Sequence, residues 1–114
     1  MLPAPARLRS STEFAVALGG RRVRRGHLVI HLAATTDPDV RVGLSVSKAV
    51  GNSVTRHAVS RRLRHLMAPR LTDLPSGSRV VVRALASAAL ADSKALAVDI
   101  DAALGDLNVA RKQR

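Results

Sequence analysis

The sequence predicts a single α+β domain, a two-layer sandwich in which helices pack on one β-sheet. Two observations support this fold class. Some segments alternate apolar with polar residues or consist of valines, as strands do, whereas others carry apolar residues at helical spacing. The expected order is helix, two or more strands, helix, strand, helix. With 114 residues the chain can form one core, so we expect one domain over residues 1–114, with 1–6 and 109–114 flexible.

The first helix is expected over residues 11–18. Residues 10–13 read Ser-Ser-Thr-Glu, which has the form of a capping box, and Gly19-Gly20 ends the helix. This segment contains Phe14, the only aromatic residue among Phe, Tyr and Trp in the chain. On a short helix such a residue is by default part of the core.

Three strands follow from the residue patterns. Residues 21–25, Arg-Arg-Val-Arg-Arg, are expected in a loop that enters the first strand at 27–34, where Leu28, Ile30 and Leu32 share one face. Along 40–47 the apolar residues alternate with Arg41, Gly43, Ser45 and Ser47, so we expect this second face to be small, polar and open. The valines of 79–85 indicate a strand inside the sheet.

The final helix is expected to begin near Asp92-Ser93. Its apolar residues recur at helical spacing, which is the pattern of an amphipathic helix that docks on a core. They are Leu96, Ile100, Ala103, Leu104 and Leu107.

Basic residues dominate the chain and are unevenly distributed. Lysine and arginine number 19 against 8 acids, giving a net charge of +11. Residues 1–86 hold 15 basic and 4 acidic side chains, whereas 87–114 hold 4 of each. Sixteen of the basic residues are arginines, whose planar guanidinium suits phosphate. The excess therefore indicates a polyanionic partner.

The longest basic segment is predicted to be a helix of about four turns. Gly51-Asn52 suits a turn and an N-cap, and no Gly or Pro follows until Pro69. Helical spacing places Val59, Leu63, Leu66 and Met67 on one stripe, with His57, Arg61, Arg64 and His65 nearly opposite.

The simplest interpretation of such a charged stripe is a solvated helix face. Solvated faces usually mix signs, because like charges spaced four apart destabilise a helix. Residues 48–70 contain no Asp or Glu, which favours binding of a polyanion on this face.

Several function classes are excluded or disfavoured by composition. The chain has no cysteine, which excludes disulfides, thiolate nucleophiles and zinc sites built on Cys. Its four histidines lack the spacing of a helical zinc motif, so no metal site is expected. The sequence shows neither a signal peptide nor a membrane span, so we expect a cytoplasmic protein without membrane association.

One stretch resembles a known family. Lys48-x-x-Gly51-Asn52-x-Val54-x-Arg56, followed by Arg61 and Arg64, resembles the signature helix of the protein subunit of bacterial ribonuclease P. Residues 7–14 look like the opening of that family, and residues 41–48 look like its strand that runs into the helix. The resemblance covers residues 7 to 107.

The resemblance implies an α+β sandwich of the ribonuclease P protein type. Its order is helix-strand-strand-strand-helix-strand-helix, with a left-handed crossover where a right-handed one is the rule. It also implies an RNA-binding subunit of a ribonucleoprotein endoribonuclease. Such a subunit helps a catalytic RNA remove the 5′ leader of precursor transfer RNA. It does so by binding the leader and by stabilising the RNA at low magnesium. The active site would lie in the RNA, which would also hold most of the magnesium, and no protein residue would be catalytic.

Site residues follow from this resemblance and from the charge pattern. The basic helix and its start are expected to contact the catalytic RNA through Lys48, Asn52, Arg56, His57, Arg61, Arg62, Arg64 and His65. The cleft between the first helix and the sheet is expected to hold the leader through Phe14, Leu18, Arg9, Arg41, Gly43 and Ser45. Leu18 occupies a position where many relatives have a second aromatic residue. With one aromatic available, arginine–phosphate contacts should carry more of the leader binding than base stacking.

Other functions are weaker interpretations. His57 and His65 could serve a self-sufficient ribonuclease, but eight residues of helix separate them by about 12 Å, too far to flank one phosphate. The acids before residue 87, Glu13, Asp37, Asp39 and Asp73, suggest no shared magnesium site. A structural RNA-binding protein, such as a ribosomal component, fits the composition but not the signature. A DNA-binding helix-turn-helix is disfavoured because a strand precedes the basic helix.

Overall fold

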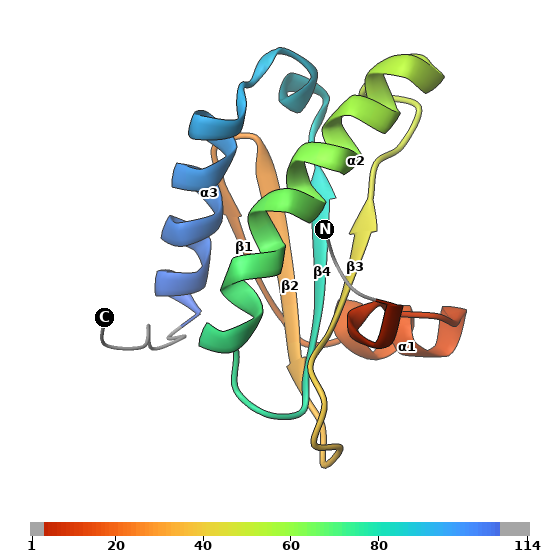
Figure 1. Cartoon of the computed structure of the whole chain (residues 1–114), viewed down its shortest axis with the longest axis vertical. Coiled ribbons are helices and arrows are strands. Elements are labelled where there is room, and N and C mark those ends of the chain that lie inside the picture. Colours follow the sequence, from red (N-terminus) through yellow and green to blue (C-terminus); the bar gives the residue numbers. More distant parts are fainter. Residues whose placement is uncertain (1–3, 108–114) are drawn as a thin grey trace.

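The structure is a computed structural model that describes residues 4–107, and it contains one four-stranded sheet with three α-helices (Figure 1). The elements, in chain order, are α1 (Ser11–Leu18), β1 (Arg21–Arg25), β2 (Leu28–Ala34), β3 (Arg41–Ser45), α2 (Ser53–Met67), β4 (Ser78–Ala84) and α3 (Ser93–Asp106). Three short 3-10 segments add η1 (Ala4–Ala6), η2 (Ala68–Asp73) and η3 (Ala86–Leu90). This order confirms the predicted α+β fold.

The strands lie in the order β1-β2-β4-β3. β2 pairs antiparallel with both β1 and β4, whereas β3 and β4 are parallel and are connected through α2. In Figure 1, α2 lies in front of the sheet, β3 and β4 both point upward, and β4 lies to the left of β3. The crossover is therefore left-handed, as the resemblance implied and against the general rule.

Residues 21–25 form strand β1, so the prediction of a loop there was wrong. Val23 is the only apolar residue of this strand, which left no alternation to detect. The strand forms because Gly26, at φ +54°, reverses the chain and aligns β1 with β2, with Val23 opposite Ile30. Pairing with the neighbouring strand β2, not local propensity, makes this segment a strand.

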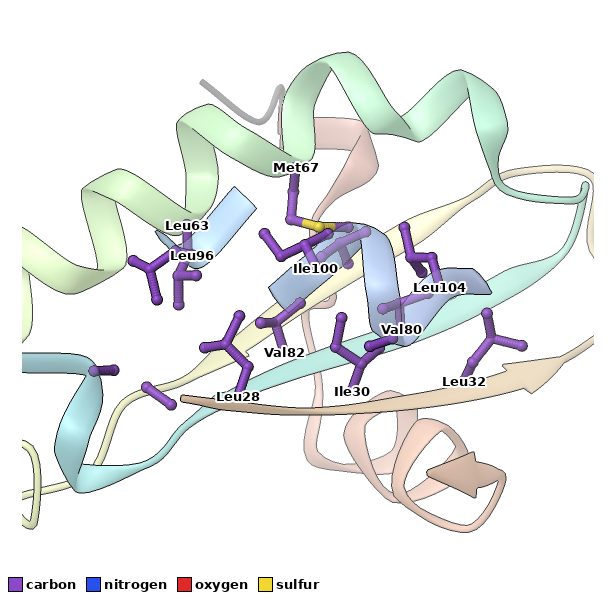
Figure 2. Packing of buried hydrophobic residues seen from close by; sticks show 14 of the residues in the cluster. Leu28, Ile30, Leu32, Leu63, Met67, Val80, Val82, Leu96, Ile100 and Leu104 are labelled. Carbon is purple, nitrogen blue, oxygen red and sulfur yellow. The ribbon is translucent and has the colours of Figure 1, made fainter. Parts of the chain in front are cut away.

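The main core lies between the sheet and the pair α2 and α3. Leu28, Ile30 and Leu32 point from β2 toward these helices (Figure 2), as their alternation predicted. They meet the predicted apolar stripes of both helices. The buried helix residues are Val59, Leu63 and Met67 of α2 and Leu96, Ile100, Ala103 and Leu104 of α3, with Leu107 just beyond.

α1 packs on the opposite face of the sheet. There Ala17, Leu8 and Val81 form a second buried cluster, and Phe14 packs against it half-buried. Gly43 lies beneath this cluster: a Cβ built on it would come within 2.5 Å of the Phe14 ring and 2.9 Å of Leu8 Cδ1. The expected open surface is therefore not found at Gly43, because Leu8 and Phe14 cover it.

The predicted caps of α1 and α2 are present. Asn52 Oδ1 accepts a hydrogen bond from the Thr55 backbone N–H at 2.9 Å, and Asp92, which was not predicted as a cap, caps α3 in the same way. Ser10 caps α1, accepting from the Glu13 backbone N–H at 3.2 Å. The Glu13 side chain accepts from the backbone N–H of Arg9 instead of Ser10, one residue earlier than a capping box requires.

The terminal segments were expected to be flexible. Within residues 1–6, Ala4–Ala6 form the 3-10 segment η1 and Ala6 is buried. Residues 1–3 and 109–114 lie outside the described range.

Candidate nucleic-acid interface

The arginines divide into a paired and an unpaired group. Ion pairs tie Arg25, Arg41, Arg70 and Arg79 to carboxylates of other segments. In the part of the chain that the structure describes, no ion pair is found for the arginines of α2, which are Arg56, Arg61, Arg62 and Arg64, or for Arg22, Arg24 and Arg83 of the sheet. The paired group holds elements together, and the second group offers free positive charge.

A groove runs along α2 at the β3 edge of the sheet. It consists of two hollows of about 220 Å³ each that share Ser60. We call these together the α2 groove. Its lining residues are Arg7, Leu8, Phe14, Val42, Gly43, Leu44, Ser60 and Arg64 in one hollow, and Val46, Ser53, Arg56, His57 and Ser60 in the other. The lining contains three arginines and no acid, so the groove favours an anionic ligand.

Two arginines of the groove have buried nitrogens without partners. Among the described residues, Nε of Arg56 and Nε of Arg64 donate to no hydrogen-bond acceptor. The nearest polar partner of Arg56 is the Ser53 hydroxyl, 3.4 Å from Nη2. An unpaired buried donor is costly, and a phosphate oxygen would relieve that cost.

The structure does not gather all predicted α2 residues in one place. Arg56, His57 and Arg64 line the α2 groove, whereas Arg61 and His65 are exposed on the side of α2 away from the core. Arg62 is half-buried and lines neither hollow. Lys48 and Asn52 are exposed and precede the helix at its N-terminus.

The predicted leader cleft is also divided. Phe14 and Gly43 meet in the α2 groove, and Ser45 follows Gly43 on the same face of β3. Leu18 is 46% exposed at the end of α1, and Arg9 is exposed before that helix begins. The cleft therefore combines the Phe14 ring, which packs over the sheet at Gly43, with exposed residues at the two ends of α1.

Arg41 is engaged within the protein. Its Nη1 donates to Glu13 Oε2 at 2.8 Å, and its Nη2 donates to Asp39 Oδ2 at 3.0 Å. Arg79, only 3% exposed, lies beside it in the sheet and pairs with Asp37 at 2.9 Å and with Glu13 at 3.8 Å. We call these five residues the Glu13 cluster. Three of the four acids that suggested no shared site in the sequence thus come together, around two guanidinium groups.

Sequence reasoning missed a second basic surface on the same face as Phe14. Arg22, Arg24, Val29 and Arg83 line a hollow of about 250 Å³, which we call the arginine pocket. Arg22 and Arg24 belong to β1, which was predicted as a loop. The alternation of Val29 with Leu28 and Ile30 was the one available signal that this face existed.

The sheet register connects the arginine pocket to the predicted cleft. One row across the four strands reads Arg24, Val29, Arg83, Ser45, and the row beside it reads Arg22, His31, Val81, Gly43. Phe14 lies over the Gly43 end of the second row. We call these two rows the sheet strip. At about 4.8 Å per strand, the strip spans roughly 14 Å.

His31 lies in the middle of this strip and is 4% exposed. Burial, with the nearby charges of Arg83 and Arg22, lowers the pKa of His31 below 6.5. Burial therefore favours the neutral imidazole. Neither ring nitrogen has a hydrogen-bond partner among the described residues.

Two further properties concern residues 4–107. None of the helices in this range combines the length and the apolar character needed to cross a membrane. In the same range, no three His, Asp or Glu side chains converge in a way that could hold a metal ion.

Comparison with known proteins gives one consistent family. Residues 2–108 match the family described as Ribonuclease P. The ribonuclease P protein component of Salinispora tropica is 48% identical over an alignment covering 100% of this chain and 98% of the relative. That of Streptomyces griseus is 54% identical, covering 91% and 93%.

Solved structures show the same fold at lower identity. The ribonuclease P protein of Staphylococcus aureus aligns with a TM-score of 0.82 at 21% identity, over 91% of this chain and 96% of that one. The protein from Thermotoga maritima aligns with a TM-score of 0.73 at 18% identity, over 84% and 92%. The α+β sandwich and its connections are thus shared with these two proteins.

Proposed function

We propose, from the premise that this chain belongs to the ribonuclease P protein family, that the α2 side of its α2 groove binds the catalytic RNA. The sheet strip, which meets the groove at Phe14 and Gly43, binds the 5′ leader of precursor transfer RNA. Membership makes the chain the RNA-binding subunit of a ribonucleoprotein endoribonuclease that acts in transfer RNA 5′ processing. The proposal assigns each RNA to a surface according to the charges and side chains found there. Since the proposed substrate is precursor transfer RNA, the proposed location is the cytoplasm.

The unpaired arginines of α2 are the main support for binding of the catalytic RNA. Arg56 and Arg64 line a groove without acids, and Arg61 extends the positive charge onto the exposed side of the helix. A folded RNA presents phosphates on a broad surface, and a helix with cations on two sides can contact several of them. Each phosphate contact releases counterions, so binding should weaken steeply with salt.

The sheet strip is better suited to a single strand. It has arginines at one end and the Phe14 ring at the other. A flat ring provides a stacking surface for one base, and unpaired arginines can follow the phosphates. Ser45 and Gly43, which the sequence placed in the cleft, lie in the strip, whereas Arg41 is neutralised by Glu13 and Asp39.

We further propose that the magnesium ions of the reaction are held mainly by the RNA. The closest approach to a carboxylate site is the Glu13 cluster, where Arg41 and Arg79 pair with all three acids. Such acids are poor magnesium ligands, because the metal would have to displace guanidinium groups. These residues therefore do not fit a magnesium site.

The first test is cleavage of precursor transfer RNA by the cognate catalytic RNA at low magnesium. Three reactions are compared: RNA alone, RNA with this protein, and RNA with the Arg61→Ala/Arg64→Ala variant. We expect the protein to restore cleavage and the double variant to restore much less. The charge-matched control is Arg25→Ala/Lys94→Ala, which removes two cations from the α3 side and should behave like wild type.

Other outcomes would overturn specific parts of the proposal. Equal loss in both double variants would mean that net charge matters and the α2 groove does not. Cleavage by the protein without RNA would contradict an active site in the RNA and would revive His57 and His65 as candidates. If the protein has no effect at all, its role in processing would be contradicted.

A further inference from the structure

We infer that Glu13 is a positioning residue that holds the Phe14 ring over Gly43 and thereby sets the affinity for the leader. The inference rests on the proposed leader site. It differs from that proposal in assigning a role to a carboxylate, the group least expected beside a path for phosphates.

Glu13 connects three segments that meet beneath α1. Its Oε1 accepts from the backbone N–H of Arg9 at 2.9 Å, and its Oε2 accepts from Arg41 Nη1 at 2.8 Å. Arg79 Nε lies 3.8 Å from the same oxygen. One carboxylate thus ties the first turn of α1 to the chain before it, to β3 and to β4.

α1 packs on β2 and β4 but buries little of its own surface there. It has eight residues, and only Ala17 among them is buried. A helix of two turns has little stability of its own, so tertiary contacts decide where it lies. Phe14 follows Glu13 directly in the sequence. A change in the tether of Glu13 would therefore move the ring.

The ring has a narrow position to occupy. Gly43 lacks a Cβ, and the space that such an atom would fill is taken by Phe14 Cζ and Cε1 and by Leu8 Cδ1. Close packing of this kind places one Gly43 α-proton against the Cζ and Cε1 atoms of an aromatic ring. A ring that shifted from this position would lose both its packing and its orientation for stacking on a base.

Electrostatics alone predicts the opposite role for Glu13. The Glu13 cluster has three carboxylates and two guanidinium groups, so it carries one more negative than positive charge. If Glu13 acted only through its charge, it would repel RNA, and Glu13→Gln would strengthen binding. If Glu13 positions Phe14, the same variant weakens leader binding. The two roles thus differ in the sign of the effect.

The first measurement uses the free protein and needs no RNA. Phe14 is the only Phe, Tyr or Trp residue, so an NMR comparison with Phe14→Leu gives the ring-current shift that Phe14 imposes on the Gly43 α-protons. We expect Glu13→Gln to reduce that shift. Glu13→Asp should also reduce it, because the shorter side chain keeps the charge but cannot reach both Arg9 and Arg41.

The second measurement uses the holoenzyme assembled with the cognate catalytic RNA. Leader discrimination is defined as the ratio of the affinities for precursor transfer RNA and for the same transfer RNA without its leader. We expect Glu13→Gln to lower this ratio by about fivefold or more, the effect of losing about one base stack. Asp106→Asn is the control, because it also removes one acid but lies on the α3 side, where it pairs with Arg25.

A double-mutant cycle shows whether Glu13 acts through Phe14. In the Phe14→Leu background, Glu13→Gln should have no further effect on the ratio. Unchanged Gly43 shifts in both Glu13 variants, or a higher ratio in Glu13→Gln, would overturn the inference while leaving the leader site intact. If Phe14→Leu itself leaves the ratio unchanged, the leader site is wrong and the inference falls with it.

Discussion

Gly43 is a position where one added carbon should affect both stability and binding. A Cβ there would lie 2.5 Å from Phe14 Cζ and 2.9 Å from Leu8 Cδ1, closer than atoms can pack. We expect Gly43→Ala to lower the free energy of unfolding by about 1–3 kcal/mol, the usual cost of overpacking, and to weaken leader binding. Urea denaturation and leader affinity measure the two effects.

Gly105 provides the matched control for this substitution. It lies in α3, and a Cβ added there would meet nothing within 4 Å. Gly105→Ala should leave leader binding unchanged and should stabilise the protein by up to about 1 kcal/mol, because alanine favours a helix more than glycine does. If Gly43→Ala proved equally harmless, the packing of Phe14 over Gly43 would be contradicted.

Residue-level prediction succeeded for the faces of the strands and failed for what covers them. Alternation along residues 40–47 correctly placed Gly43 opposite Val42 and Leu44. It could not show that Leu8 and Phe14 cover Gly43, or that Glu13 and Asp39 neutralise Arg41. Apart from the Asp39–Arg41 pair, which joins residues two apart, those contacts join segments about 30 residues apart, and no local pattern encodes them.

The pKa of Glu13 predicts how stability depends on pH. The backbone N–H of Arg9 and the guanidinium of Arg41 hold this pKa below its usual value of 4.5, although partial burial opposes them. A pKa lowered by folding means that the native state binds the proton less readily than the unfolded state does. The contribution of the ionised Glu13 to the unfolding free energy is therefore complete above the unfolded pKa and is lost as pH falls through the folded pKa. Between pH 6 and 3, the unfolding free energy of the wild type should therefore fall more steeply than that of Glu13→Gln. Parallel curves would show that the ion pair contributes no pH-dependent stability.

At the scale of the element, the N-cap of α2 allows stability and RNA binding to be separated. Asn52→Ala removes the acceptor for the Thr55 N–H and should cost about 1 kcal/mol of unfolding free energy. Asn52→Asp keeps the acceptor and adds a negative charge that the helix N-terminus favours, so stability should be maintained. The same charge should weaken binding of the catalytic RNA if phosphates approach this end of α2. Chemical denaturation and RNA titration of both variants test this, and undiminished RNA binding by Asn52→Asp would place the RNA elsewhere.

The elements themselves were predictable to the degree that their signals are local. α1, α2 and α3 follow from start signals and helical spacing, since Ser10 and Asn52 cap as expected and α3 begins where predicted, after Asp92. β1 was missed because its four arginines surround a single valine and its strand character depends on β2. The same error hid the arginine pocket, because Arg22 and Arg24 belong to a sheet face only once β1 is a strand.

At the scale of the whole molecule, the charge is arranged for binding at some expense of stability. The net charge is +11, and seven of the described arginines without an ion pair lie on α2 and on the sheet strip. Like charges on one surface repel each other in the free protein, and a polyanion converts that repulsion into attraction. Stability of the free protein and affinity for RNA should therefore change in opposite directions when these arginines are removed.

The variant Arg22→Gln/Arg24→Gln tests this opposition on the sheet strip. Removing two unpaired cations should raise the unfolding free energy of the free protein by a few tenths of a kcal/mol in low salt, and the gain should vanish near 0.5 M salt, where screening is short-ranged. In the holoenzyme the variant should bind precursor with a leader more weakly. The slope of the logarithm of its affinity for precursor against the logarithm of salt concentration should be shallower by about 0.7 for each lost phosphate contact. The affinity of the variant for leaderless transfer RNA should be unchanged. Arg25→Gln serves as the control, because Arg25 is paired with Asp106 and its loss relieves no repulsion. If the double variant weakened binding of both RNAs equally, the arginine pocket would contribute general charge and would not be a leader site.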